Sequence, residues 1–553
     1  MKKIKDKLCT KETIYKCLML FLILQPILDI YILFKPEVVN FFGFSPATII
    51  RILFIGVLGL LFLFTTKFNK KYWWFVVYGA LVVLYTVLHH INALEFNSVS
   101  EDGFGYNLVS ELFYLIRMLM PLFMIVLSAH YKFEDKKMEK LITWLVVLLA
   151  GSIVVTNLLG ISTGSYSKTQ ISANIFHWFD PNTEYNYVDF ASKGFFNDPN
   201  RISALMVLIT PLLFYVFVKN PNKKNGFLLI IQMLGMYMLG TKVAVLGFFV
   251  LLLASICIYL YFVLIKKELT WNKKIFAFFM IFFVAAGALL YWTPAIDRTM
   301  VDQTREENHK KNVKGERSEE EKKIMAMDAQ LLELITVDEE SAINFDEVFK
   351  EDEENSLYVS KSQIYTIDKE QSEKLLNEFI EDNYLDFSLN PQFVLYSYPY
   401  ENDPYFWYKI MKWSLMERTN FRMVERAMLD RVKTINANPA DDYLGITFTR
   451  MSNIFDLERD FLSHYYTLGI LGLCLFLFPY LIIFLLAIFM MLYHYKEKFT
   501  FRNVMLMLGI AITLFAAYYS GNCMDGLVVT LILGFVMGQL VEPVFAKKKL
   551  KAK

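Results

Sequence analysis

Charged side chains inside apolar stretches are the first residues of this sequence that could do chemistry. Arg51 and Arg117 lie within long apolar runs, and Lys242 lies where two such runs meet. A charge in a bilayer costs a few kcal/mol even on lenient insertion scales, so each one is a candidate for a site. All three fall toward the same side of the membrane. A cationic pocket for a doubly charged anion such as a pyrophosphate would explain this placement, because guanidinium groups match phosphate oxygens.

A second interpretation of these charges needs no ligand. Asp29 would pair with Arg51. Glu111 would pair with Arg117, and Lys242 would extend its amine to the membrane surface. Structural ion pairs need not all lie on one side of a membrane, so the shared side of the charges favours the pocket.

A polar turn, KGFFNDPNR at 193–201, precedes another apolar run. Asn197 or Asp198 can close an Asx turn, and Pro199 fits the first turn of a helix. Helix-start chemistry does not explain the cations on both sides of the turn, so a structural and a functional interpretation both stay open. The candidate binding residues here are Lys193, Asn197, Asn200 and Arg201.

The elements that must position these residues are membrane helices. Of the 553 residues, 55% are hydrophobic and 16% are aromatic, which excludes an ordinary soluble domain. Apolar runs of about 17 to 25 residues predict an all-α polytopic membrane protein with about twelve transmembrane helices. The spans are expected at 14–34, 47–66, 72–90, 108–129, 139–160, 200–218, 226–241, 243–265, 274–294, 466–493, 502–520 and 526–543.

Lysines punctuate alternate connections between these runs. The N-terminus, the connections near 67–71, 132–137, 219–224, 266–274 and 496–502, and the tail at 547–553 are lysine-rich, whereas 91–107 has no basic residue. The positive-inside rule therefore predicts a multi-pass protein of the plasma membrane with both termini in the cytoplasm. The five cysteines show neither a disulfide framework nor zinc spacing, and no metal site is expected.

This topology predicts three parts. Residues 1–294 hold spans 1 to 9, residues 295–465 form one large extracytoplasmic loop between spans 9 and 10, and residues 466–553 hold spans 10 to 12 and a basic cytoplasmic tail. Within the loop, the stretch at about 300–400 is acidic and is expected to be a solvated insertion without chemistry. The stretch at about 404–435 is basic with apolar residues at helical spacing, which predicts an amphipathic helix near the outer surface.

Four places in the sequence resemble, in order, the motifs of the bacterial O-antigen ligase and O-antigen polymerase superfamily. They are the turn at 193–201, the small-residue motif at 238–244, the segment at 422–429 with Pro439 and the glycine turn at 444–445, and the block at 458–462 with 469–472. Each motif is short and degenerate. Four in order, on twelve predicted spans with the long loop outside, make a more specific resemblance.

The resemblance implies site residues, with departures. Lys193 and Lys242 stand where the family commonly has arginine, so the charge is kept and the bidentate geometry is lost. The family's loop histidine falls at Glu458, which with Asp460 would act as a carboxylate base; alternatively His464 takes that role. By the same resemblance, Arg422 on the loop helix belongs with the substrate-binding residues.

The implied architecture is GT-C-like and the implied activity is that of a membrane glycosyltransferase. It would polymerise or ligate a glycan carried on undecaprenyl pyrophosphate, at the extracytoplasmic face, in cell-surface polysaccharide biosynthesis. The resemblance implies no nucleotide sugar, metal ion or other cofactor. Its partners would be the lipid-linked donor, an acceptor glycan or lipid, the bilayer and other polysaccharide-assembly proteins, with no nucleic acid. The choice between ligase and polymerase is open.

Two other functions compete with this one. A multi-span transporter or a flippase of lipid-linked glycan would also have twelve spans, but alternating access favours charges near the midplane rather than on one side. A non-catalytic assembly partner could use the acidic loop to recruit wall enzymes. Neutral replacement of Arg117 separates an enzyme from a scaffold, because it would abolish turnover and leave partner binding intact.

Overall fold

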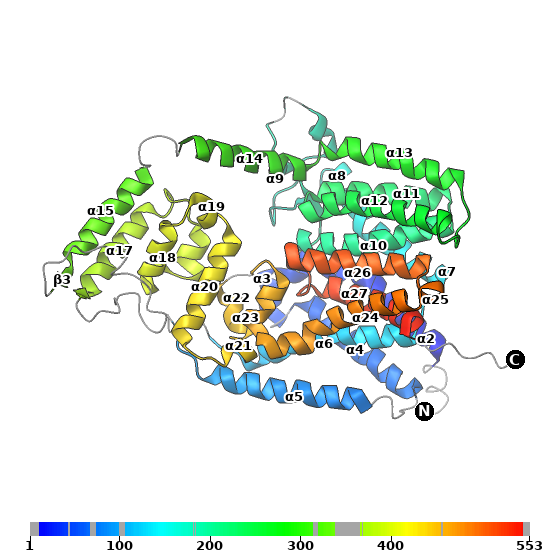
Figure 1. Cartoon of the computed structure of the whole chain (residues 1–553), viewed down its shortest axis with the longest axis horizontal. Coiled ribbons are helices and arrows are strands. Elements are labelled where there is room, and N and C mark those ends of the chain that lie inside the picture. The colour runs from blue at the N-terminus through cyan, green and yellow to red at the C-terminus, as the bar shows by residue number, and fades with distance from the viewer. Residues whose placement is uncertain are drawn as a thin grey trace. The chain divides into compact units, whose positions relative to one another are not determined.

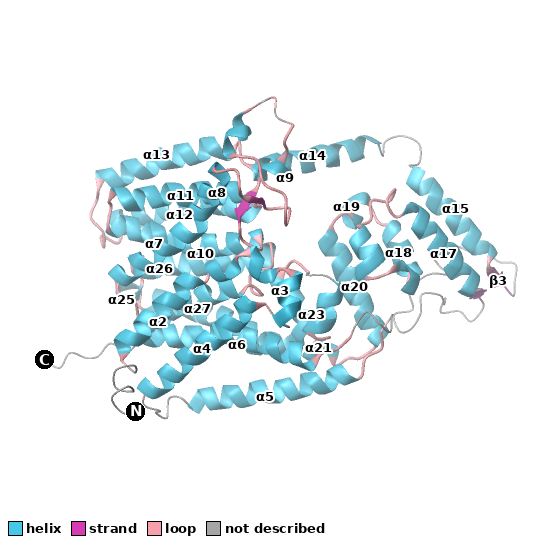
Figure 2. Cartoon of the chain, turned by 180° about the vertical axis from the view of Figure 1, so that it is seen from behind, coloured by secondary structure: helices cyan, strands magenta, loops and turns pink. Residues whose placement is uncertain are grey.

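The computed structural model is almost entirely helical (Figures 1 and 2). It describes residues 10–42, 45–66, 73–98, 105–180, 182, 184–312, 319–337, 365–367, 369–454 and 457–545. Among these, the strands form two short antiparallel pairs, β1 (Thr163–Gly164) with β2 (Ser192–Gly194), and β3 (Ile335–Val337) with β4 (Tyr365–Ile367). The predicted all-α membrane class is confirmed at this level.

The chain divides into two compact units. Unit 1 comprises Met1–Val77, Leu115–Val301 and Phe476–Lys553, and unit 2 comprises Tyr78–Tyr114 and Asp302–Leu475. The predicted boundaries at 294 and 465 rest on membrane sidedness and stay a prediction. Among the described residues, three α-helices contribute to both units: α5 (Trp73–Leu94), α6 (Leu108–His130) and α14 (Pro294–Asn312).

Unit 1 is a helical bundle around α10 (Pro199–Lys219), which is buried along nearly its whole length. It packs against α7 (Asp135–Val146), α11 (Lys223–Leu239), α12 (Lys242–Leu264), α26 (Phe501–Tyr519) and α27 (Leu527–Phe545) (Figure 1). The other helices of this unit are α2 (Lys11–Leu24), α3 (Pro36–Phe42), α4 (Pro46–Thr65), α8 (Ser152–Leu158), α9 (Tyr187–Phe190), α13 (Lys273–Leu290), α24 (Phe478–Tyr493) and α25 (Tyr495–Lys498). Gly509 permits a close contact between α26 and α10, because a Cβ atom there would lie 2.6 Å from the carbonyl oxygen of Leu208.

Ten helices of the described residues are long and apolar enough to cross a membrane. They correspond to ten of the twelve predicted spans. The other two predicted spans, the first and the seventh, contain α2 and α11, which have 14 and 17 residues. The count of twelve therefore stays a prediction, as does the cytoplasmic side of the termini, whose lysines at 2–7 and 547–553 lie outside the described residues.

The first predicted span is interrupted. The prediction of one continuous helix over 14–34 is wrong, because α2 ends at Leu24 and two 3₁₀ turns follow at Ile27–Asp29 and Tyr31–Phe34. Pro26 explains the break, since proline has no N–H to continue the helical hydrogen bonds and disfavours helical geometry at the residue before it.

The predicted boundary between the seventh and eighth spans is observed. Gly240 ends α11 in the left-handed region with a φ of 70°, and the Thr241 side chain caps α12 by accepting from the Ala244 N–H. A C-terminal glycine followed at once by an N-cap threonine lets two helices meet with hardly any loop.

Unit 2 encloses a separate core of aromatic and aliphatic side chains. Its helices are α15 (Glu319–Glu333), α17 (Lys369–Asn383), α18 (Pro404–Met411), α19 (Leu415–Arg418), α20 (Phe421–Asn436), α21 (Asp441–Leu444), α22 (Phe448–Ile454) and α23 (Asp460–Gly472), with most of α5. Trp407 lies fully buried in this core, and its indole N–H donates to the Tyr398 carbonyl at 2.7 Å. The long insertion thus folds around its own hydrophobic centre.

Two expectations for this insertion are wrong. The first concerns the acidic stretch, parts of which are packed rather than solvated: α15 buries Met327 and Leu331, and α17 buries Leu376 and Ile380, each pair at helical i, i+4 spacing. Within the same stretch, residues 338–364 lie outside the described residues.

The second concerns the basic stretch at 404–435, which forms three helices rather than one. Short non-helical connections at Lys412–Ser414 and Thr419–Asn420 separate α18, α19 and α20. A capping box between Ser414 and Glu417 starts α19. The apolar face of α20, with Met428 and Leu429, packs into the core of unit 2. Packing on protein explains the amphipathic pattern of α20, and its predicted place near the outer surface stays a prediction.

Two glycines bring α21 and α23 into backbone contact. Gly445 has a φ of 80°, and a Cβ atom there would lie 2.3 Å from the Thr467 carbonyl oxygen. Gly469 has a φ of 64°, and its Cβ would lie 2.3 Å from the Tyr443 carbonyl carbon. Both positions exclude a side chain by conformation and by space.

We expect Gly445→Ala to lower the free energy of unfolding by at least about 3 kcal/mol, because it combines a strained φ with a backbone clash. The measurement is the thermal unfolding midpoint of the purified full chain in detergent. Gly79→Ala is the control, since Gly79 lies inside α5 and a methyl group there would meet no atom within 4 Å. That control is expected to keep or slightly raise the midpoint; equal midpoints for the two variants would contradict the predicted contact.

Candidate functional site

The turn at 193–201 is held by the broken end of the first predicted span. Ile30 and Phe196 form an antiparallel bridge, the Tyr31 N–H donates to the Phe195 carbonyl at 2.8 Å, and the Asn197 N–H donates to the Asp29 carbonyl at 2.9 Å. The interruption of the helix at Pro26 makes this pairing available, because helical backbone at 29–31 would have its own N–H and carbonyl groups occupied. The polar turn is thus a fixed element.

The start of α10 follows from the last residues of the turn. The Asp198 carboxylate accepts from the N–H groups of Asn200 and Arg201, at 2.7 and 3.2 Å, and Pro199 is the first helical residue. The predicted Asx turn and proline helix start are therefore observed, with Asp198 as the capping residue. Cap formation points the N-terminal end of α10 at the turn, which favours negative charge there.

Lys193 lies under this turn on β2 and is 3% exposed. Its Nζ donates to the Asn197 carbonyl at 3.4 Å. Burial lowers the pKa of the Lys193 amine, Asp198 opposes that shift, and Lys168 adds to it. The predicted binding residue is thus buried, and its amine is directed back at the turn.

Arg51 is held by a residue that sequence reasoning missed. Its Nε donates to Gln25 Oε1 at 2.8 Å, its Nη2 donates to the Gln25 backbone oxygen at 3.3 Å, and the residue is 2% exposed. The suggested Asp29 to Arg51 ion pair is not formed among the described residues; the Asp29 carboxylate attracts Arg51 from a longer distance. The sequence did carry a signal for Gln25, because a polar side chain directly before Pro26 stands out in an apolar run.

Arg117, on α6, points to the loop before α27. Its Nη2 donates to the Asp525 backbone oxygen at 2.9 Å. Arg201 reaches the same loop, since a Cβ atom on Gly526 would lie 3.0 Å from the Arg201 Cγ. Three predicted binding residues, from α4, α6 and α10, therefore converge in unit 1.

We call Arg51, Arg117, Lys193 and Arg201 the cationic cluster. Arg117 and Arg201 lie close enough to Arg51 to repel its charge. Among the described residues, the four cations share this region with three aspartates, Asp29, Asp198 and Asp525. Arg201 pairs with one of these aspartates, since its Nε lies 3.7 Å from Asp198 Oδ2. A bound anion would relieve the remaining repulsion among the cations.

Lys242 begins α12 beside the start of α10. Thr241 Oγ1 lies 2.5 Å from Ser203 Oγ, which ties the two helix starts together. Gly240 contacts the chain just before β2, because a Cβ there would lie 2.7 Å from the Ala191 Cβ. The small-residue motif and the polar turn, separate in sequence, are therefore packed against each other.

In unit 2, Glu458 is bound by the predicted binding residue Arg422. The Arg422 Nε donates to Glu458 Oε2 at 2.9 Å, and the side chains are 30% and 36% exposed. Arg459, which follows, has a φ of 115°, a strained conformation for a residue with a side chain. The strained turn separates Glu458 from Asp460, so the two carboxylates do not act as neighbours on one helix face.

Asp460 and His464 are both buried in the first turns of α23. Asp460 is 1% exposed and His464 is 0% exposed. The His464 Nδ1 donates to the Asp460 backbone oxygen at 2.5 Å, and its ring centroid lies 6.4 Å from that of Tyr114. Of the three candidate catalytic residues, Glu458 is therefore the most accessible.

The Glu111 to Arg117 ion pair of the second, ligand-free interpretation is not formed among the described residues. Glu111 instead pairs with His89, whose Nε2 lies 2.8 Å from Glu111 Oε1, and both side chains are almost fully buried. The two residues belong to unit 2, whereas Arg117 belongs to unit 1. Residues six apart lie on different faces of a helix, so position in the apolar run was a poor guide to the partner.

A family profile described as O-antigen ligase like membrane protein matches residues 11–545. The chain belongs to this family. Comparisons with curated proteins and with solved structures gave no match. Membership covers nearly all of the chain, so the resemblance that rested on four short motifs is confirmed for the whole membrane protein.

Membership in the O-antigen ligase like family indicates glycosyl transfer related to polysaccharides. In this member, the motif residues fall into both units: the turn and the small-residue motif lie in unit 1, and Arg422, Glu458 and His464 lie in unit 2. Among the described residues, no group of three or more histidine, cysteine, aspartate or glutamate side chains could hold a metal ion.

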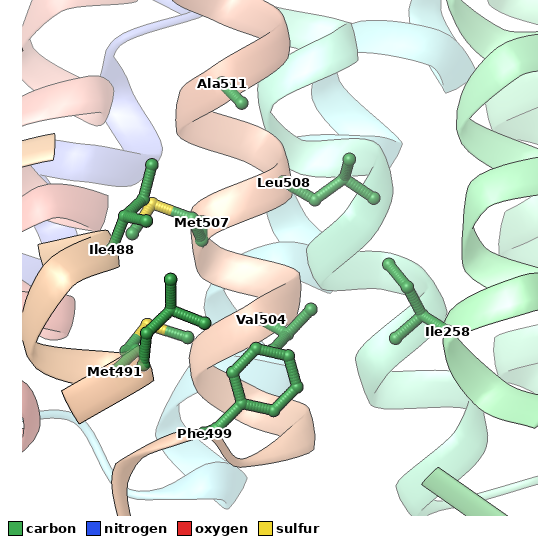
Figure 3. A pocket seen from close by; sticks show the side chains of 9 residues that line it. Ile258, Ile488, Met491, Phe499, Val504, Met507, Leu508 and Ala511 are labelled. Carbon is green, nitrogen blue, oxygen red and sulfur yellow. The ribbon is translucent and has the colours of Figure 1, made fainter. Parts of the chain in front are cut away.

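A groove of about 250 Å³ also opens on unit 1, between α12, α24 and α26 (Figure 3). Its lining is entirely apolar: Ile258, Ile488, Met491, Leu492, Phe499, Val504, Met507, Leu508 and Ala511. Without a polar group it can neither bind an anion nor transfer a proton. The chemistry of this family member therefore lies elsewhere.

The lowered pKa of Lys193 predicts the pH dependence of anion binding. As pH rises, this amine loses its proton before an exposed lysine would, so inorganic pyrophosphate should dissociate at a lower pH from the wild type than from Lys193→Arg. Calorimetric titrations from neutral to alkaline pH would measure this. Lys168→Arg, at the exposed neighbour, should leave the wild-type profile unchanged; identical profiles for all three proteins would contradict the prediction.

Proposed function

We propose that this protein is a membrane glycosyltransferase that polymerises or ligates a glycan carried on undecaprenyl pyrophosphate. It would act at the extracytoplasmic face of the plasma membrane, in the assembly of a cell-surface polysaccharide. Family membership supports glycosyl transfer, and the cationic cluster is the observation that carries the choice of a pyrophosphate-linked donor.

The donor role follows from the electrostatics of unit 1. Arg51 is buried and oriented by Gln25, while the charges of Arg117 and Arg201 repel it. Groups of like charge persist together when a ligand of the opposite charge compensates them, and a pyrophosphate offers two charges and several acceptor oxygens. The N-terminal end of α10 adds to this attraction.

The sidedness of the reaction rests on the length of α10. Arg201 lies in its first turn and Lys219 ends it, next to a lysine-rich connection. At about 1.5 Å per residue, the two cations are separated by roughly 27 Å, close to the hydrocarbon thickness of a bilayer. If the lysine-rich side is cytoplasmic, the cationic cluster is at the outer face.

The transfer requires few steps. The acceptor hydroxyl oxygen attacks the anomeric carbon of the donor glycan, and the bond from that carbon to the pyrophosphate oxygen breaks. The electron pair goes to the leaving pyrophosphate, whose developing charge the cationic cluster stabilises. The hydroxyl proton goes to a base, for which we propose the Glu458 carboxylate.

Exposure and charge support Glu458 over its neighbours. A base must be reached by the acceptor, and Asp460 and His464 are fully buried while Glu458 is 36% exposed. The Arg422 guanidinium orients the Glu458 carboxylate through a hydrogen bond from its Nε. His464 stays the alternative base.

We expect Arg117→Ala to lower glycan transfer by at least about 100-fold, because it removes a cation that would stabilise the leaving group. The measurement uses the purified full chain in liposomes with a short glycan on undecaprenyl pyrophosphate, without nucleotide sugar or divalent metal. Lengthened or transferred glycan and released undecaprenyl pyrophosphate are quantified together.

Arg502→Ala is the matched control for that experiment. Arg502 also donates from Nη2 to a backbone carbonyl, that of Phe133 at 2.8 Å, but it starts α26 at the lysine-rich side. It should keep transfer. If the glycan stays unchanged while its carrier crosses the bilayer, the protein is a flippase and the proposed function is overturned.

A second comparison tests the base. Glu458→Gln should reduce transfer by about 100-fold, since an amide cannot accept the hydroxyl proton. Its unfolding midpoint should barely change, because a partly exposed ion pair contributes at most about 1 kcal/mol. Retained transfer in Glu458→Gln together with lost transfer in His464→Gln would move the role of base to His464.

A further inference from the structure

A buried pair of titratable side chains in unit 2 has no place in the steps above. His89 lies near the end of α5 and Glu111 near the start of α6, and each is 1% exposed. The His89 Nε2 lies 2.8 Å from Glu111 Oε1. Burying two ionisable groups is costly unless every polar atom has a partner, so the partners of this pair indicate what it is for.

Glu111 holds the beginning of α22. Its carboxylate accepts from the Phe448 N–H at 3.0 Å and from the Thr449 N–H at 3.3 Å. Backbone N–H groups can only donate, so both of these hydrogen bonds are accepted by the Glu111 side chain. The preceding residue, Thr447, has a φ of 81°, a strained conformation that needs such support.

His89 holds the chain just before that point. Its Nδ1 donates to the Leu444 carbonyl at 2.6 Å. The ring stacks on Tyr85, with centroids 5.4 Å apart, and the Tyr85 hydroxyl donates to the Leu468 carbonyl of α23 at 2.7 Å. The pair thus fixes both ends of the segment 444–449 and reaches α23.

The segment 444–449 is in turn packed on α23, the helix that carries Asp460 and His464. Gly445 meets the α23 backbone at Thr467, and Tyr114 stacks on Phe448 with centroids 4.2 Å apart. The same Tyr114 ring neighbours His464. Movement of this segment would therefore displace the start of α23, where the strained turn after Glu458 leads in.

We propose that His89 and Glu111 are positioning residues for glycan transfer, which hold segment 444–449 and through it the start of α23 in the reactive arrangement. This role rests on the proposed function, because it concerns the acceptor side of that reaction. Neither residue touches the reacting atoms. Their replacement should lower kcat and leave the KM for the lipid-linked donor unchanged, since the cationic cluster belongs to unit 1.

The experiment compares His89→Gln with His90→Gln in the full chain in liposomes. His90 is the next residue of α5, is partly exposed, and bonds the Tyr106 hydroxyl at 2.9 Å, so it controls for loss of a histidine from this helix. His89→Gln should lower kcat by about 100-fold, as expected when a reacting group is displaced by about 1 Å, with the donor KM within about twofold. Hydrogen exchange of peptides covering 444–468 should be faster in His89→Gln and unchanged in His90→Gln.

Glu111→Gln is the second variant, for use if His89→Gln does not fold. The glutamine side chain keeps an oxygen that can accept from the Phe448 N–H. Glu111→Gln should therefore lower kcat less than His89→Gln does, and it should also make hydrogen exchange of 444–468 faster. Equal kcat and equal exchange in the His89 and His90 variants would overturn the proposal, as would a rise of the donor KM in His89→Gln. If the wild type transfers no glycan, the proposed function fails, and with it the role of His89 and Glu111 in transfer. If hydrogen exchange of 444–468 is also the same in His89→Gln and the wild type, the pair does not hold this segment either.

Discussion

The pairing of residues 29–31 with the turn at 195–197 is the constraint on which the anion-binding region depends. It requires that the α-helix stop before Pro26, since the short 3₁₀ turns on either side of the extended Ile30 leave N–H and carbonyl groups free to pair with another segment. With the turn fixed, Asp198 can cap α10 and Lys193 can be buried beneath it. A continuous first helix would remove all three consequences at once.

Buried charge imposes the second condition. Arg51 is satisfied by Gln25 and attracted by Asp29, yet Arg117 and Arg201 repel it. This repulsion lowers stability, and a set of neutral residues in the same place would have avoided it. Crowded like charges of this kind are typical of a site that binds an anion, which is why they, rather than the apolar groove on α12, α24 and α26, support the choice of substrate.

The large insertion achieves its rigidity differently. Its core is apolar and aromatic, but the contacts that place α21, α22 and α23 are backbone contacts at Gly445 and Gly469 and the buried His89 and Glu111 pair. Polar groups buried with all their partners specify one arrangement, because every alternative leaves a charge unpaired. A segment carrying reactive side chains benefits from that specificity more than from extra hydrophobic burial.

The sequence by itself determined the membrane class, most of the helix positions, a capped helix start at Pro199, the junction at Gly240 and Thr241, and the family, since hydropathy, capping residues and motifs are local properties of the chain. It left Asn197 and Asp198 open as the capping residue, and the structure selects Asp198. The sequence also indicated Arg51, Arg117, Lys193 and Arg201, because a charge in an apolar run or beside a polar turn is conspicuous alone. Partner choice was decided by the tertiary structure. The two residues of each pair lie 22 to 36 positions apart in the sequence: Gln25 with Arg51, His89 with Glu111, and Arg422 with Glu458. The amphipathic faces of α15, α17 and α20 cover a protein core, and no local pattern distinguishes that environment from water or lipid. Such pairs and faces are selected by how helices distant in sequence pack, and the packing is set by the whole chain at once.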